Sequence, residues 1–137
     1  MSSTPPPEWH LTETYKGLIT LSVEALKLLA LVNGGAAVAV LTYLGNLASR
    51  SPPAVHLPNL KPALLWYSGG LLATVVAFIV AYVTQLRLFA EEIARRGGQR
   101  FRPLHAAGVW AGCLLALFAA VAFGLGCLRS ASALIPS

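Results

Sequence analysis

Long apolar runs bounded by charged residues dominate the chain. Residues 28–49, 62–86 and 103–128 contain no Asp, Glu, Lys or Arg. Each run exceeds the ~20 residues that an α-helix needs to cross ~30 Å of hydrocarbon. A soluble helical bundle would need polar faces at helical spacing, which these runs lack. The pattern predicts an all-α integral membrane protein with three transmembrane helices and short cytoplasmic helical extensions.

The residues between the apolar runs divide the chain further. Apolar residues recur at steps of three and four from Glu8 onward, which predicts an amphipathic cytoplasmic helix that continues into span 1 over residues 8–50. Span 2 is expected to continue into a charged cytoplasmic helix, over 62–96, because Glu and Arg residues follow each other at intervals of four. The remaining expected segments are a mobile polar tail at 1–7, an exported proline-rich loop at 51–61, a basic turn at 97–103, span 3 at 104–129 and an exported tail at 130–137.

The basic residues predict the orientation. With three spans, the N-terminus and the second connection share one side, which holds seven of the ten Lys and Arg residues: Lys16, Lys27, Arg87, Arg95, Arg96, Arg100 and Arg102. The other side holds Arg50, Lys61 and Arg129. The positive-inside rule then predicts a cytoplasmic N-terminus and an exported C-terminus, which we expect in a bacterial inner membrane. The five arginines from Arg87 to Arg102 are also expected to contact anionic lipid headgroups.

Composition supports the membrane interpretation. Hydrophobic residues make up 56% of the 137 residues and charged residues only 11%, against roughly 25% charged residues in ordinary soluble domains. The net charge of +5 raises the question of nucleic acid. The basic residues, however, lie at the ends of apolar runs rather than along one face, so no nucleic-acid partner is expected.

Small residues recur at intervals of four in every span. They are Gly108, Gly112, Ala116, Ala120 and Gly124 in span 3, Gly69, Ala73, Ala77 and Ala81 in span 2, and Gly35 and Ala39 in span 1. In a bilayer, small residues let two helix backbones approach closely, and this spacing favours pairs that cross at about −40°. We expect these series to be helix-packing surfaces, within the chain or against another subunit.

Five uncharged polar residues lie within the spans: Asn33, Thr42, Asn46, Ser68 and Thr74. Amides and hydroxyls in lipid usually bond to neighbouring helices, so interhelical hydrogen bonding is the leading interpretation. The alternative is that they line a passage in a homo-oligomeric channel or membrane-permeabilising effector. The absence of ionisable residues from the spans argues against strong ion selectivity.

Residues that carry chemistry are sparse. Catalysis would need a nucleophile with a base, or a set of metal ligands, and the spans contain neither, so no enzymatic activity, metal or resident cofactor is expected. His105, at the cytoplasmic mouth of span 3, could bind haem or lie near a quinone in a membrane anchor. A bis-histidine haem would need a second intramembrane histidine, and His10 and His56 lie outside the spans. Cys113 and Cys127 share one helix at ~21 Å, too far apart for a disulfide.

The leading hypothesis from the sequence is therefore a small non-enzymatic inner-membrane assembly or interaction subunit. We expect it to associate with itself, or with another membrane protein, through the small-residue series. The channel and the haem or quinone anchor are the alternatives.

Overall fold

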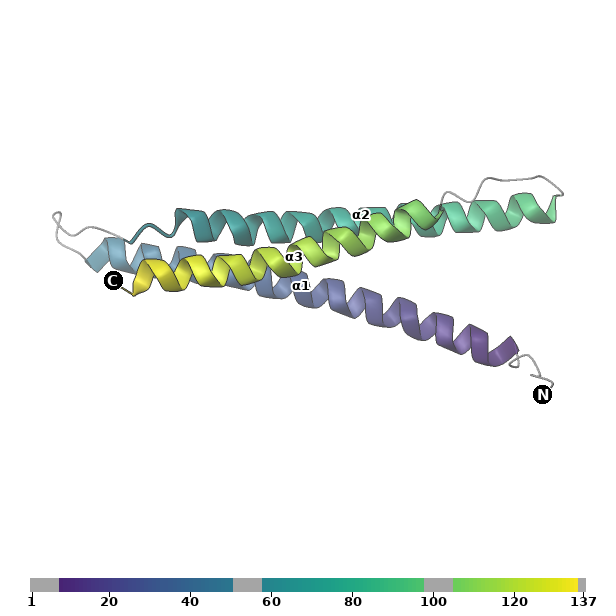
Figure 1. The fold of residues 1–137 in the computed structure, drawn as a ribbon, viewed down its shortest axis with the longest axis horizontal. Coiled ribbons are helices and arrows are strands. Elements are labelled where there is room, and N and C mark those ends of the chain that lie inside the picture. The colour runs from purple at the N-terminus through teal and green to yellow at the C-terminus, as the bar shows by residue number, and fades with distance from the viewer. Residues whose placement is uncertain (1–7, 51–57, 98–104, 136–137) are drawn as a thin grey trace.

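The computed structural model describes residues 8–50, 58–97 and 105–135. It contains three α-helices: α1 at Glu8–Arg50, α2 at Lys61–Arg96 and α3 at His105–Leu134 (Figure 1). Helix α3 continues five residues beyond Arg129, where the sequence pattern places the end of span 3. The expected tail at 1–7, most of the expected loop and the basic turn with Arg100 and Arg102 lie outside the described residues.

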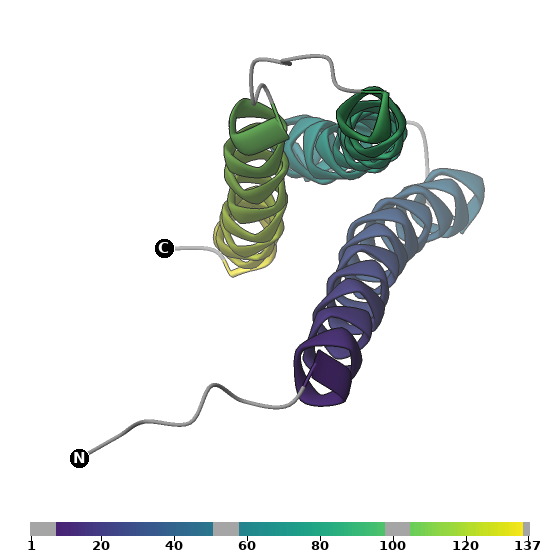
Figure 2. The ribbon, with the colours of Figure 1, turned by 90° about the vertical axis from the view of Figure 1, so that its right-hand side faces the viewer.

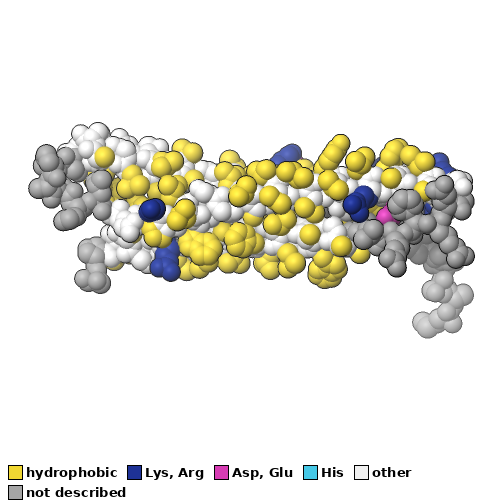
Figure 3. All heavy atoms as spheres, turned by 90° about the horizontal axis from the view of Figure 1, so that it is seen from above, with side chains coloured by type: hydrophobic (Ala, Val, Ile, Leu, Met, Phe, Trp, Pro, Cys, Tyr) yellow, Lys and Arg dark blue, Asp and Glu magenta, His cyan; other side chains and the backbone are white. Residues whose placement is uncertain are grey.

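All three helices are long and apolar enough to cross a membrane. They contain 43, 36 and 30 residues, so even the shortest exceeds the ~20 residues that a span requires. Hydrophobic side chains cover most of the length of the face drawn in Figure 3. The prediction of an all-helical chain with three long apolar helices is thereby confirmed.

Helices α2 and α3 form a closely packed antiparallel pair, whereas α1 is more loosely attached. In Figure 1, α2 and α3 run side by side, and α1 diverges from them toward its N-terminus. Figure 2 shows the same divergence from the end where α1 begins. The described side chains from Trp9 to Ala25 are all exposed, and burial on α1 begins at Leu26. Helix α1 therefore contacts the pair only along its second half.

The packed face of α2 follows a heptad rather than the expected four-residue series. Six of its seven buried residues succeed one another at steps of four, three, four, three and seven: Ala63, Tyr67, Gly70, Thr74, Ala77 and Thr84. The seventh, Ala73, lies beside Thr74. This spacing is typical of left-handed pairs that cross near +20°. Of the expected series, Ala73 and Ala77 are buried, Gly69 is half-buried and Ala81 is exposed.

Helix α3 departs from its expected series in the same way. Gly108 faces α2, but Ala120 and Gly124 are exposed, and the buried positions are Ala119, Ala122 and Gly126. Each step of four residues advances about 40° beyond a full turn, so four steps rotate the series by about 160°. A four-residue series thus begins on the packed face and ends on the opposite one.

The ends of α2 have simple local causes. Pro62 occupies the first helical turn, where its missing N–H leaves no hydrogen bond unmade. The Lys61 N–H donates to Asn59 Oδ1 at 3.3 Å. At the other end, the Gly97 N–H donates to the Ile93 carbonyl at 3.2 Å and closes the last turn.

Candidate helix-packing site

Three glycines bring the helices into close contact. A Cβ added to Gly70 would run into Asn33 Oδ1, one added to Gly108 would run into Thr84 Oγ1, and one added to Gly126 would lie against Cε1 of the Tyr67 ring. The missing side chains therefore set the distance between helices at these points. In lipid, such close approach is a main source of helix association.

Asn33 connects all three helices. Its side chain on α1 is fully buried, and its Nδ2 donates to the Leu29 carbonyl at 3.0 Å and to the Ala119 carbonyl of α3 at 3.2 Å. Its Oδ1 lies against Gly70 of α2. This one side chain is thus a junction between α1 and the α2–α3 pair.

The junction leaves one polar atom without a conventional partner. Within the described residues, Asn33 Oδ1 is buried and accepts no hydrogen bond. Because a Cβ built on Gly70 would collide with this oxygen, a Cα–H of Gly70 points toward it. Weak Cα–H···O contacts of this kind recur at close helix–helix interfaces. Gly70 therefore provides both the space for Asn33 and the closest group to its oxygen.

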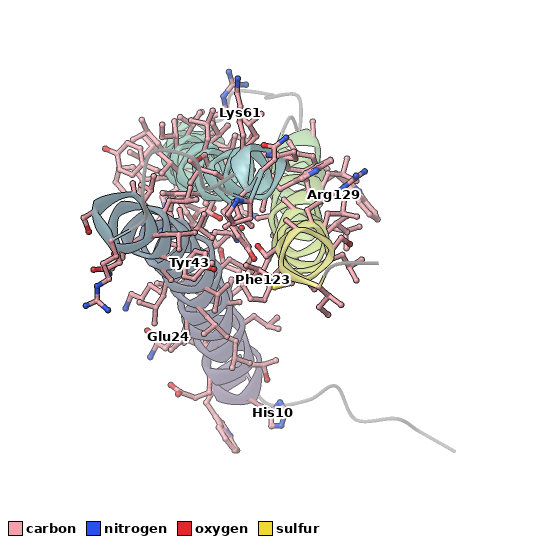
Figure 4. All side chains as sticks on the ribbon, turned by 90° about the vertical axis from the view of Figure 1, so that its left-hand side faces the viewer. His10, Glu24, Tyr43, Lys61, Phe123 and Arg129 are labelled. Atoms are coloured by element: carbon pink, nitrogen blue, oxygen red, sulfur yellow. The ribbon has the colours of Figure 1, made fainter. Side chains whose placement is uncertain are left out.

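A second contact point lies near the start of α2. Tyr67 is buried, with its ring against Gly126 and tilted on the Phe123 ring at a centroid distance of 6.0 Å. Its hydroxyl donates to Cys127 Sγ at 3.5 Å and shares a hydrogen bond with Ser130 Oγ at 3.3 Å. Figure 4 views the molecule from this end. Tyr67 thus joins α2 to one side of α3 through ring packing and two long hydrogen bonds.

The polar residues suggested as the lining of a passage are not gathered by the single chain. Thr74 is fully buried, and its hydroxyl donates within α2 to the Gly70 carbonyl at 2.9 Å. Ser68 of α2 is exposed, as are Thr42 and Asn46 of α1. Since α1 contacts the pair through other positions, Thr42 and Asn46 lie on its outward face.

Parts of every small-residue series remain uncovered. A Cβ added to Gly35, Gly69, Gly112 or Gly124 would meet no described atom within 4 Å. Ala39 is exposed and Ala116 is half-buried. Gly69 lines a shallow apolar hollow on the outer face of the α2–α3 pair together with Pro62, Leu65, Trp66 and Phe118. The α2–α3 pair and α1 therefore present small-residue surfaces outward as well as inward.

The charged end of α2 is partly neutralised. Glu92 Oε1 accepts a hydrogen bond from Arg96 Nε at 3.0 Å. The other carboxylate oxygen, Glu92 Oε2, lies 2.8 Å from Arg95 Nη2 in an ion pair. The hydrogen bond from Arg96 lowers the pKa of the Glu92 carboxyl. Arg87, which lies five residues before Glu92 on α2, is also exposed. The carboxylate is thus held in its ionised form beside two of the arginines expected to contact lipid.

The sequence offers His105 as the candidate residue for a haem or quinone site. Across residues 8–50, 58–97 and 105–135, no three His, Cys, Asp or Glu side chains are placed to hold a metal ion. His105 is the first residue of α3, and its side chain lies outside the described part of the structure.

Sequence reasoning missed Gly70 and Gly126 because each lies beside, and not within, a four-residue series. The available signal was the alternation of four and three: Gly70 lies three residues after Tyr67 and four before Thr74, and Gly126 lies four after Ala122. A search for heptad spacing would have selected both. The chain matches no protein family, curated protein or solved structure with which it was compared.

Proposed function

We propose that this protein is a small non-enzymatic membrane subunit that self-associates through the small residues of α3 that α2 leaves uncovered. The observation that carries the proposal is the contrast between glycines on one helix. Gly108 and Gly126 meet α2 side chains, whereas Gly112 and Gly124 have open space where a Cβ would stand. Open glycines on an apolar helix allow the backbone of a second helix to approach closely in lipid.

A consistent membrane placement supports this proposal. Because Thr84 contacts Gly108 in an antiparallel pair, Tyr82 and Trp110 lie at the same level. From this level to Lys61 is about 31 Å along α2, close to the ~30 Å of a bilayer's hydrocarbon. Both aromatic side chains are exposed, as expected for residues at a lipid–water boundary.

The same placement extends α1 and α2 beyond the bilayer on the side where α1 begins. We assign that side to the cytoplasm of a bacterial inner membrane, because the start of α1 and the arginine-bearing end of α2 lie there. Arg87 then lies about 7.5 Å beyond the level of Tyr82, near the headgroups, where it contributes roughly 1 kcal/mol of attraction to anionic lipid, whereas Arg95 and Arg96 extend about 20 Å beyond that level.

Native mass measurement of the full chain in lipid nanodiscs tests self-association. The wild type should give multiples of 14.4 kDa, and Gly112→Leu should shift the population to the monomer. The Cβ of a leucine at residue 112 would meet no described atom within 4 Å, so the change is expected to act mainly on contacts between chains.

Gly17→Leu is the matched control, because Gly17 is equally open but lies outside the apolar runs. It should leave the mass distribution unchanged. A wild type that stays monomeric as its concentration in lipid rises contradicts the proposal. An oligomer unaffected by Gly112→Leu contradicts the assignment of the interface.

A further inference from the structure

Two apolar stripes face each other across an open wedge. We use this name for the space between residues 9–25 of α1 and residues 82–96 of α2, at the end of the molecule where α1 begins. Figures 1 and 2 show the two helices separating progressively in this region. Large apolar side chains on both helices are exposed there: Tyr15, Leu18, Tyr82, Leu86, Phe89 and Ile93.

The contact between α1 and α2 fixes their antiparallel register. Asn33 lies against Gly70, and the next residue, Gly34, would contact the Leu71 side chain at 3.8 Å if it carried a Cβ. Residues at the same level of the two helices therefore have numbers that add to about 104. This register extends without interruption into the wedge, because both helices continue through it.

The apolar stripes continue the two helix faces that are in contact where Asn33 and Gly34 of α1 meet α2. Tyr15 precedes Asn33 by eighteen residues, about five turns, and so projects from the same face of α1. Phe89 follows Leu71 by eighteen residues, also about five turns, and shares its face of α2. Tyr15 and Phe89 are 51% and 65% exposed, lie at the same level, and face the wedge.

A second pair repeats the relationship nearer the contact. Ser22 precedes Asn33 by eleven residues and Tyr82 follows Leu71 by eleven, about three turns in each case. The helix ends also coincide, since α1 begins at residue 8 and α2 ends at residue 96. The two extensions thus match in length and register.

The charged side chains of α1 do not obstruct an approach. Glu13 and Glu24 lie about half a turn round the helix from Tyr15, and each is paired on that outer side with a lysine three residues later. An approach of the two stripes therefore covers apolar surface on α1 and leaves its two ion pairs uncovered on the other side of the helix.

We propose that residues 9–25 of α1 close onto residues 82–96 of α2 in the same chain, by a pivot at Asn33, Gly34 and Gly35. Glycine is the weakest helix former apart from proline, and a Cβ at Gly35 would meet no described atom, so α1 can bend there. Closure within one chain brings together stripes whose register is already set. A second copy would first lose translational and rotational freedom. The closure goes beyond self-association and does not depend on it.

Disulfide trapping in native lipid tests the closure. In a chain with Cys113→Ala and Cys127→Ala, Tyr15→Cys with Phe89→Cys should oxidise about tenfold faster than Glu13→Cys with Phe89→Cys, because closure raises the effective concentration of only the first pair. The product should keep the mass of one chain, 14.4 kDa. Equal rates for the two pairs overturn the proposal, and so does a covalent dimer, which would place the stripe of a second copy in the wedge.

A distance measurement tests the closure independently if the cysteine pair disturbs insertion of the chain into the membrane. Spin labels at Ser22→Cys and Tyr82→Cys should report a population with a short separation beside the open one. A single long separation, with no short population, overturns the proposal.

Discussion

The α2–α3 pair and α1 are held in place by different kinds of contact. Gly108 and Gly126 bring α3 against α2 at points eighteen residues apart on α3, so the two helices contact each other over most of their length. Helix α1 has one deeply buried polar junction, at Asn33, and separates from the pair beyond it. Contact spread over most of two helices fixes them relative to each other, whereas contact confined to the second half of α1 leaves its first half free to pivot.

The largest expected effect is that of Gly70→Leu, because this glycine belongs to both regions. Its side chain would collide with Asn33 and force α1 away from the pair. Overpacking of a tight interface costs about 3 kcal/mol here, at the upper end of its usual range. Reversible unfolding in mixed detergent would measure this loss in the free energy of unfolding.

Gly69→Leu is the control for that experiment, since the neighbouring glycine has no described atom within 4 Å of its Cβ position. It should change the free energy of unfolding by less than about 0.5 kcal/mol. A similar loss from both variants would show that position in the helix, and not contact with Asn33, determines the cost.

Asn33→Ala should weaken the attachment of α1 and leave the α2–α3 pair intact. The variant removes the hydrogen bond to the Ala119 carbonyl, and interhelical bonds of this kind in membranes contribute about 1 kcal/mol or less. Crosslinks between α2 and α3 should be retained while those from α1 decrease. Asn46→Ala, at an exposed amide on the same helix, should leave both sets unchanged. Loss of the α2–α3 crosslinks in Asn33→Ala would contradict the separation of the two regions.

Tyr67→Phe should have the smallest effect of these three substitutions. It keeps the ring on Gly126 and removes hydroxyl contacts that are long, at 3.5 Å to Cys127 Sγ and 3.3 Å to Ser130 Oγ. We expect a loss of about 0.5 kcal/mol in the free energy of unfolding. Tyr82→Phe, at an exposed tyrosine, is the matched control. A loss above about 2 kcal/mol would mean that the hydroxyl, and not the ring, joins the helices.

The three helices could be predicted from the sequence because a long uncharged apolar run can adopt few structures in a bilayer. Runs of this length must form helices in lipid, where every backbone N–H and C=O needs a partner within the segment. The ends of α2 were also predictable, from Pro62 at its start and Gly97 after its last residue. These features depend on local chemistry alone.

The choice of packed face could not be predicted in the same way. Every span has small residues on several faces, so composition cannot distinguish Gly124, which is exposed, from Gly126, which is buried. That difference depends on the handedness with which two helices cross. The Tyr67 ring packs against Gly126 and not against Gly124, a choice that depends on both helices together.

Gly124 and Gly126 provide the most direct test, because they are two residues apart on α3 and can receive the same substitution. Under conditions that keep the chain monomeric, Gly126→Leu should lower the thermal midpoint by more than about 5 °C, since leucine would displace the Tyr67 ring from the seam. Gly124→Leu should stay within about 1 °C of the wild type, because its side chain enters open space. Equal midpoints for the two variants, or a larger loss for Gly124→Leu, would contradict the claim that α2 and α3 are held together through one glycine face of α3.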